Sequence, residues 1–225
     1  GGAEGEEIKL ESSYPANSST WAISFRGAFR EFADPSGTAQ PYVICAEEPP
    51  GYTIEGGDGP FPCTDHCSAS MGCINQVMLS AGMSGSTAEL ETSAATSEQS
   101  WTVTWYADKE DFGPDAVGVA TTYSICADAP DNFALETGIA QSCVGADAPC
   151  TTTEPCPPNT VPFSGGIIGN QEKTGSLFPT ELGWVVSWFP ASYEFPDPVG
   201  QASAVVLCGS GTITRETIFS SGFDA

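Results

Sequence analysis

A segment that contains tryptophan is followed 24 or 25 residues later by a segment that contains cysteine, and this arrangement occurs three times in the 225-residue chain. The three pairs are Trp21 and Cys45, Trp101 and Cys126, and Trp184 and Cys208. Successive copies are separated by a nearly constant interval, and self-similarity at a fixed period is the signature of a repeated structural unit. We therefore predict one domain over residues 1–225, built from three repeats at about 1–72, 73–155 and 156–225.

The tryptophan segments alternate in the way that β-strands do. Trp101, Val103 and Trp105 fall on one face of an extended chain, and Thr102 and Thr104 fall on the other. No stretch shows a sustained period of 3.6 residues, and 25 glycines and 18 prolines disfavour helices. The fold class is therefore predicted to be all-β, with three internal antiparallel repeats of about 80 residues.

Each repeat is expected to open with a glycine-rich strand, followed by a polar loop and turn, the tryptophan strand, a second loop and the cysteine strand. The polar loops are expected at residues 13–15 and 177–179. Closing three such repeats on one another would remove exposed sheet edges. A pseudo-threefold β-prism or a trefoil-like body fits best, and a row of small sandwiches is the alternative.

The nine cysteines follow the same period. The first four map in order onto the next four, and one more follows: Cys45, Cys63, Cys67 and Cys73, then Cys126, Cys143, Cys150 and Cys156, then Cys208. A disulfide framework copied with its repeat indicates an oxidising compartment, so we expect a secreted, extracellular or cell-surface protein.

Four cysteines allow three pairings per repeat. We favour long bridges from one repeat to the next and short bridges within the inserted loops: Cys45–Cys73 and Cys126–Cys156, with Cys63–Cys67 and Cys143–Cys150. This leaves Cys208 unmatched. Its expected partner would precede residue 1, so the first repeat is predicted to be truncated at its N-terminus and the chain to be a piece of a longer protein. Intermolecular pairing of Cys208 is the alternative.

The chain is strongly acidic, with 29 acidic against 6 basic residues and a formal charge of -23. Such a surface repels phosphate backbones, which argues against nucleic acid and anionic membranes as partners. There is no run of about 18 apolar residues, so no membrane span is expected.

Acidic residues recur in the loop after each tryptophan strand, and they are candidate calcium ligands: Glu31, Asp34, Asp111, Asp115, Glu194 and Asp197. Calcium takes six to eight oxygen ligands. Two carboxylates per loop are too few for that, so a turn stabilised by Asp, Pro and Gly is the favoured interpretation. No other cofactor is expected.

Catalysis is not predicted. His66 is the only histidine, and no Gly-x-Ser-x-Gly elbow is present. The tryptophans are expected in the core because they alternate with aliphatic residues. Three aromatic residues in loops form a candidate ligand platform: Tyr14, Phe178 and Tyr193.

Cys156-Pro157-Pro158-Asn159-Thr160-Val161, followed by Gly165-Gly166, Trp184 and Cys208, resembles tandem repeats of secreted bacterial proteins, notably actinobacterial ones of unassigned role. Tyr-x-Ile-Cys-Ala at Cys45 and Cys126 fits the same pattern, and the match departs from it at the inserted cysteine loops and at Ile74. The layout is also similar to the vitelline-membrane outer-layer proteins, which are β-prisms, but this likeness concerns architecture and carries no function.

Taken together, these features favour a non-catalytic secreted or cell-surface β module that recognises a glycan or an extracellular partner protein through its loops. The alternative is a structural or accessory subunit of an extracellular assembly, such as a sheath, a filament, a virion decoration or a complex-bound subunit. Self-assembly would accompany that role.

Overall fold

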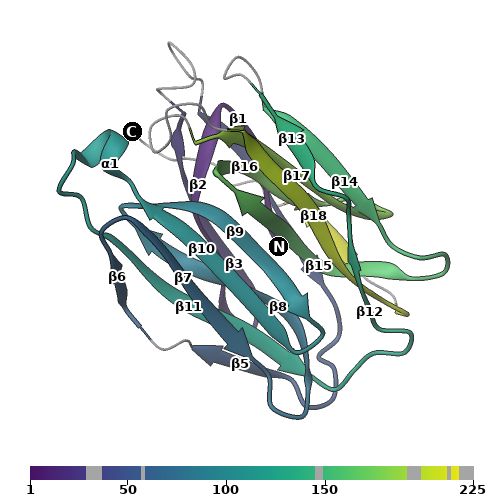
Figure 1. Cartoon of the computed structure of the whole chain (residues 1–225). Coiled ribbons are helices and arrows are strands. Elements are labelled where there is room, and N and C mark those ends of the chain that lie inside the picture. The colour runs from purple at the N-terminus through teal and green to yellow at the C-terminus, as the bar shows by residue number, and fades with distance from the viewer. Residues whose placement is uncertain (29–36, 57–58, 145–148, 192–198, 212–213, 218–225) are drawn as a thin grey trace.

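The all-β class is confirmed by the computed structural model. The structure describes residues 1–28, 37–56, 59–144, 149–191, 199–211 and 214–217. Within these ranges the chain forms nineteen strands and one four-residue helix. The strands build three antiparallel sheets that lie around a shared interior (Figure 1). No helix in the described part of the chain is long and apolar enough to cross a bilayer.

The first sheet has six strands, and it combines both ends of the sequence. Its order is β14 (Cys150–Pro155), β17 (Gly183–Pro190), β16 (Glu172–Pro179), β1 (Gly2–Glu6), β4 (Thr38–Cys45) and β19 (Thr214–Thr217). β1 therefore lies between a strand from the last third of the chain and its own near neighbour β4, with Ala3 opposite Leu177 and Gly2 opposite Tyr42.

The second sheet combines the middle of the sequence with its last third. Its order is β12 (Ala134–Thr137), β18 (Gly200–Gly209), β15 (Val161–Asn170), β9 (Ala88–Ser97), β10 (Ser100–Ala107) and β7 (His66–Gly72), and β13 (Gln141–Cys143) also pairs with β18. β15 meets β9 where Ile167 lies opposite Ser93.

The third sheet combines the first third of the sequence with the middle. Its order is β3 (Thr20–Gly27), β2 (Ile8–Asn17), β8 (Val77–Ser86), β11 (Gly118–Ala127) and β5 (Thr53–Gly56), and β6 (Phe61–Cys63) also pairs with β11. β2 meets β8 where Ser13 lies opposite Met83. Among the described strands, β3 has a neighbour on one side only.

The core is one cluster of apolar side chains drawn from all three sheets. Trp101, Val103 and Trp105 of β10 are buried, whereas Thr102 and Thr104 are partly exposed, as the alternation predicted. Trp184 and Trp188 of β17 are also fully buried.

The polar loops expected at residues 13–15 and 177–179 are wrong, because both stretches are strands. They belong to β2 and β16, whose residues from Ile8 to Ser13 and from Glu172 to Leu177 are buried on both faces. A strand that is covered on both faces does not show the alternation of a half-buried strand. The hydroxyl groups here find partners inside the protein, as Ser12 Oγ does with the amide of Gly85 at 2.8 Å.

The helix α1 (Lys109–Phe112) was not predicted. Asp108 is its N-cap and accepts a hydrogen bond from the amide of Asp111 at 3.0 Å. The helix is a single turn, too short for a period to be visible in the sequence.

Four disulfides staple the fold: Cys63–Cys67, Cys143–Cys150, Cys73–Cys126 and Cys156–Cys208. The two short bridges are the pairs favoured above. The Cys45–Cys73 and Cys126–Cys156 pairings are wrong, and Cys208 is bonded, whereas Cys45 is the free cysteine.

Strand neighbours decide the long pairings. β8 begins at Val77, four residues after Cys73, and runs antiparallel to β11 so that Met78 lies opposite Cys126. This brings the Cα atoms of Cys73 and Cys126 to 5.7 Å, within the range that a disulfide spans. The long bridges therefore join strands of one predicted repeat and not of successive repeats.

Candidate functional site: the cavity beside Cys45

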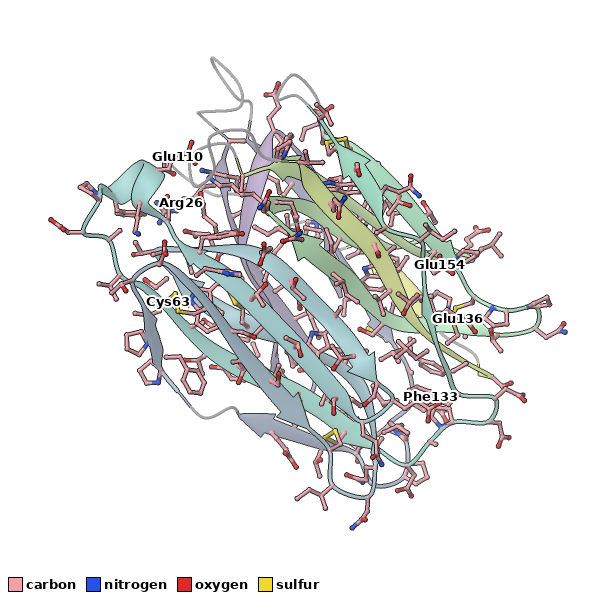
Figure 2. The ribbon with its side chains drawn as sticks, in the orientation of Figure 1. Arg26, Cys63, Glu110, Phe133, Glu136 and Glu154 are labelled. Carbon is pink, nitrogen blue, oxygen red and sulfur yellow. A yellow bond between two sulfur atoms is a disulfide. The ribbon has the colours of Figure 1, made fainter. Side chains whose placement is uncertain are left out.

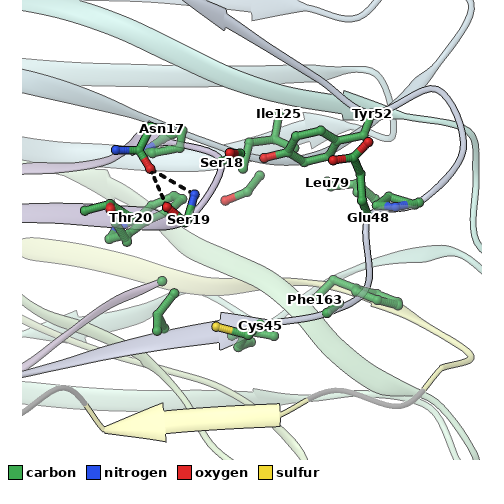
Figure 3. Close-up of a pocket in the computed structure, with 18 of the residues that line it drawn as sticks. Asn17, Ser18, Ser19, Thr20, Cys45, Glu48, Tyr52, Leu79, Ile125 and Phe163 are labelled. Atoms are coloured by element: carbon green, nitrogen blue, oxygen red, sulfur yellow. Dashed lines mark hydrogen bonds between the residues drawn. The ribbon is translucent and has the colours of Figure 1, made fainter.

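The free thiol of Cys45 opens into a cavity of about 210 Å³ (Figure 3). Cys45 is the last residue of β4 and is exposed. The turn between β2 and β3, residues 17–20, forms the opposite wall, as Figure 3 shows. Leu79 and Ile125 also line the cavity, so it lies where the first and third sheets approach one another.

Aromatic and polar groups both line this cavity. Trp21, Tyr52 and Phe163 supply three rings. Trp21 is only half-buried, whereas Trp101 and Trp184, which stand at the same place in the two other tryptophan strands, are 1% and 0% exposed. The ring of Trp21 is therefore accessible from the cavity, whereas the corresponding rings of Trp101 and Trp184 belong to the core.

Local hydrogen bonds hold the two walls in place. Asn17 Oδ1 accepts from the amide and the hydroxyl of Ser19 at 2.9 and 3.0 Å, which fixes the β2–β3 turn. The indole N–H of Trp21 donates to Ser13 Oγ at 3.0 Å. The amide of Tyr52 donates to the carbonyl of Pro49 at 3.2 Å and holds the loop that carries the ring.

The mouth of the cavity is acidic. Glu47 and Glu48 line it, and both are exposed. Partial burial and the charge of Glu48 raise the pKa of Tyr52. The phenol of Tyr52 therefore stays protonated at neutral pH and can donate a hydrogen bond to a ligand.

A second polar cluster surrounds Glu91 on the second sheet. His66 Nε2 lies 2.6 Å from Glu91 Oε2, the hydroxyl of Thr104 donates to the same oxygen, and the hydroxyl of Tyr106 donates to Oε1. Burial alone would raise the pKa of Glu91, but these hydrogen bonds outweigh it and lower that pKa. The hydrogen bond to Glu91 raises the pKa of His66. The histidine is thus engaged as the partner of a buried carboxylate.

The third polar feature is a buried charge cluster of Lys9, Lys173, Glu89 and Glu110. Lys9 Nζ lies 2.7 Å from Glu89 and 2.9 Å from Glu110, and Lys173 Nζ lies 3.0 Å from Glu89 and 2.5 Å from Glu110. Burial alone would lower the pKa of Lys9, but Glu89 and Glu110 raise it. Figure 2 shows Glu110 on α1 and Arg26 close to that helix.

Two further carboxyl groups near the cluster have shifted pKa values. Burial and the charge of Glu89 raise the pKa of Asp108 to about 6. Burial raises the pKa of Glu172 well above its ordinary value, and Glu91 adds to the shift.

Outside the cluster, partial burial and the charge of neighbouring Glu136 raise the pKa of Glu154 (Figure 2). None of these groups lines the cavity beside Cys45.

The candidate calcium ligands are only partly described. Glu31, Asp34, Glu194 and Asp197 lie outside the described residues. Asp115 is exposed, and Asp111 Oδ2 lies 3.8 Å from the ammonium of Lys9. Within the described ranges no group of three or more His, Cys, Asp or Glu residues could hold a metal ion.

The candidate ligand platform is divided between sheets. Tyr14 of β2 stacks on Tyr123 at a ring distance of 4.7 Å, and Phe178 of β16 stacks on Tyr42 at 5.6 Å. Tyr14 belongs to the third sheet and Phe178 to the first, and each stacks on a different tyrosine. Tyr193 lies outside the described residues.

The cavity beside Cys45 was not foreseen, although the sequence holds a signal for it. An odd number of cysteines in a repeated disulfide framework indicates that one cysteine has no disulfide partner within the chain. The sequence pattern indicates that Cys208 is the unpaired cysteine. In the structure Cys208 is bonded to Cys156, and the unpaired cysteine is Cys45. Comparisons with family models, with curated proteins and with solved structures found no match.

Proposed function

We propose that this chain is a non-catalytic extracellular β module that binds a partner protein at the cavity beside Cys45. The observation that carries the proposal is the cavity itself, which joins an exposed thiol, a half-buried tryptophan and the end of a strand. Apolar cavities with a few placed polar groups are the usual form of a small-ligand site, and at protein interfaces the anchor side chains of a partner fill such pockets. The four disulfides are what an oxidising compartment produces.

We further propose a pseudo-threefold β-prism as the architecture. Its support is the strand order, because each sheet joins two neighbouring strands of one predicted repeat to two of another. At each join a glycine packs against a carbonyl oxygen. A Cβ added there would lie 1.9, 1.8 or 1.7 Å from that oxygen, for Gly2 and Leu177, Gly82 and Ser13, and Gly166 and Ser93. These glycines recur in register with the sequence period.

A non-catalytic role is supported by where the titratable groups lie. Catalytic groups with shifted pKa values gather in clefts. Here Asp108 and Glu172 are fully buried, and His66 is bound to Glu91 on a different sheet from β4. The cavity thus offers shape, aromatic surface and hydrogen bonds, which serve recognition.

Sedimentation velocity of the protein isolated from its source without reductant tests partner binding. We expect a complex heavier than the 23.3 kDa chain. Recombinant wild type should rebuild the complex with the isolated partner, whereas Ser19→Trp, which fills the cavity, should not. Thr151→Trp is the matched control, because Thr151 is exposed on β14 and does not line the cavity. A monomer under these conditions, or equal binding by both variants, would contradict the proposal.

A glycan is the second candidate ligand, because three aromatic rings line the cavity beside the hydroxyl groups of Ser18 and Thr20. Sugar rings stack on exposed aromatic faces. Titration with neutral oligosaccharides should then quench the fluorescence of the wild type more than that of Trp21→Phe. Equal quenching in the two proteins would exclude this cavity as a glycan site.

A structural or accessory subunit is the other candidate role. It is favoured by β3, which ends its sheet on one side in the described part of the chain. An exposed strand edge is a template for pairing with another chain. Sedimentation would separate this role by a large or heterogeneous assembly instead of one defined complex.

A further inference from the structure

A second cavity, of about 270 Å³, lies between the second and third sheets. β7 forms one of its walls, and β11 with β5 and β6 forms the other; these strands lie together at one edge of the molecule (Figure 1). The cavity shares no lining residue with the cavity beside Cys45. The described residues that line it all fall between positions 55 and 124, so its shape is set by the middle of the chain.

Thr122 and Ser124 place two hydroxyl groups on the β11 wall of this cavity. The two residues are only 2% and 3% exposed, yet neither hydroxyl has a hydrogen-bond partner among the described residues. Neither oxygen is among the unpartnered side-chain atoms that are sealed from solvent, so both stay open to the cavity. Buried hydroxyls normally find a partner inside the protein, as Ser80 of neighbouring β8 does with Ser164 at 2.8 Å. Thr122 and Ser124 therefore offer hydrogen bonds that a ligand can complete.

The fold does not need these two hydroxyl groups. β18 corresponds to β11 in the last third of the chain and carries its own disulfide cysteine. Four and two residues before that cysteine, β18 has Ala204 and Val206, where β11 has Thr122 and Ser124. Both aliphatic residues are fully buried. Because methyl groups serve at these positions of β18, the hydroxyl groups of β11 indicate binding and not packing.

The opposite wall presents unpaired main-chain groups of β7. Within the described part of the chain, β7 ends the second sheet and has β10 as its one neighbour. The amide of Cys73, directly after β7, bonds on the β10 side to the carbonyl of Gln99. Main-chain groups alternate in direction along a strand, so those of Ser70 and Gly72 point away from β10. Both residues line the cavity, which therefore meets their N–H and C=O groups.

The rest of the lining is apolar, with one carboxylate. Phe61 of β6 supplies an aromatic ring, and Ala69 and Met71 supply aliphatic surface. Glu55 of β5 is exposed, and none of the described lining residues is basic. An anionic ligand would meet this carboxylate and a chain of formal charge -23, so an uncharged ligand fits better.

The spacing of Thr122 and Ser124 requires a ligand with several polar groups. Side chains two residues apart on a strand stand on the same face, about 6.6 Å from one another. A hydrogen bond between oxygens spans about 2.8 Å, so one ligand atom cannot bond to both hydroxyl groups. The cavity volume of about 270 Å³ lies just below the range of about 300–1,000 Å³ for drug-sized ligands. The ligand is therefore about the size of one ring with hydroxyl groups on neighbouring carbons.

We propose that this cavity binds one uncharged sugar ring. Sugar hydroxyls both donate and accept hydrogen bonds, which suits Thr122, Ser124 and the main chain of β7, and they can donate to the carboxylate of Glu55. The C–H groups on one face of a sugar ring are apolar, and they lose contact with water when they pack on the ring of Phe61. The inference goes beyond the proposed function, whose site is the cavity beside Cys45.

The three methionines of the chain provide the readout and its internal control. Met71 lines the cavity, whereas Met78 and Met83 are fully buried in the core and do not line it. Protein labelled with ¹³C at the methionine methyl groups is titrated with the methyl glycosides of glucose, galactose, mannose and N-acetylglucosamine. The NMR spectrum then reports one methyl resonance for each methionine, and Met71→Leu assigns the signal of Met71.

We expect at least one glycoside to shift the Met71 resonance in a saturable way, with the Met78 and Met83 resonances unmoved. Thr122→Val keeps the shape of the side chain but removes its hydroxyl, and should weaken binding roughly two- to tenfold, the value of one hydrogen bond. Thr121→Val is the matched control, because Thr121 is the neighbour of Thr122 on β11 and does not line the cavity. Unchanged Met78 and Met83 resonances in both variants verify that they are folded.

The absence of a saturable Met71 shift with all four glycosides would overturn the inference. Equal affinities of the Thr122→Val and Thr121→Val proteins would overturn it too, and so would an equal shift of all three methionines, which reports a change of solvent. Trp21→Phe should leave the Met71 titration unchanged, because Trp21 lines the other cavity. The sedimentation experiment decides partner binding without reference to Met71, so the two proposals can fail separately.

Discussion

Lys9 and Lys173 are two of the six basic residues of the chain, and both are buried. An ammonium group is costly to remove from water unless it is paired. Glu89 and Glu110 pair with both lysines, so two positive and two negative charges balance in the cluster. The lysines come from β2 and β16, which belong to different sheets, and the cluster therefore fixes how these sheets sit against one another.

Lys173→Met should destabilise the protein by about 3–5 kcal/mol, the range for removing one partner of a buried ion pair. The loss has a simple cause, because a negative charge stays buried without its counterion. Lys109→Met is the control, since Lys109 makes an exposed ion pair with Asp65 at 3.1 Å and should change stability by less than about 1 kcal/mol. Equilibrium urea unfolding measures both, and similar values would contradict a structural role for the cluster.

Glu172→Gln should stabilise the protein at neutral and higher pH. Burial raises the pKa of Glu172, and Oε2 has no hydrogen-bond partner in the described structure. A carboxyl whose pKa is raised on folding binds its proton more tightly in the folded state, so stability falls as pH rises above the unfolded pKa. Glutamine does not titrate, so the variant does not lose stability in this way as the pH rises.

The gain from Glu172→Gln should be small at pH 4 and should grow by up to about 1.4 kcal/mol per pH unit above the unfolded pKa, until the folded pKa is reached. Thermal unfolding of both proteins between pH 4 and pH 8 measures the difference, with the exposed Glu98→Gln as the control. A gain that is the same at every pH would show that proton binding by Glu172 is not the cause.

At the scale of elements, the disulfides divide into two energetic classes. Cys73–Cys126 closes a separation of 53 residues, and Cys63–Cys67 closes one of 4. A cross-link removes more entropy from the unfolded chain when it closes a longer loop. The double substitution Cys73→Ser with Cys126→Ser should therefore cost about 4 kcal/mol, and Cys63→Ser with Cys67→Ser about 2 kcal/mol. Guanidinium unfolding without reductant compares them, and a reversed order would contradict the entropic account.

The strands also show which parts of the fold the sequence pattern predicts and which it does not. β10 has one face in the core and one near solvent, so its alternation predicted it correctly. β2, β9 and β16 are buried on both faces over most of their length. Residues 13–15 of β2 and 177–179 of β16 were interpreted as polar loops. The polar groups of these strands form hydrogen bonds and ion pairs inside the protein. Their partners lie on strands that are distant in sequence, so the local sequence pattern does not reveal them.

The cysteines show the same limit. The two short bridges can be predicted because their cysteines lie close together in the sequence. The two long bridges depend on which strand lies beside β11 and which lies beside β18. The cavity beside Cys45 was missed for this reason, because the odd cysteine could be counted but not placed. The charge cluster was missed because burial of Lys9 is a property of three meeting sheets and not of its own neighbours in sequence.

At the scale of the whole molecule, the three sheets meet at joins where backbone approaches backbone. Gly166 of β15 lies against Ser93 of β9, and a Cβ on Gly166 would stand 1.7 Å from the carbonyl oxygen of Ser93. No side chain separates the two strands at this point, so glycine is required by the close approach and not by its backbone angles. The join can open only if the second sheet splits between β15 and β9.

Gly166→Ala should therefore cost about 3 kcal/mol or more, at the upper end of the cost of overpacking. Gly72→Ala is the matched control, because a Cβ on Gly72 would meet the carbonyl of Gln99 at an ordinary 3.6 Å. Thermal unfolding compares the two, and hydrogen exchange should show faster opening of β9 and β15 in Gly166→Ala alone. If both alanines were tolerated equally, the sheets would not depend on this contact, and the proposed threefold closure would lose one of its three joins. A large effect at Gly166, repeated at Gly82, would make the joins equivalent in energy as well as in position.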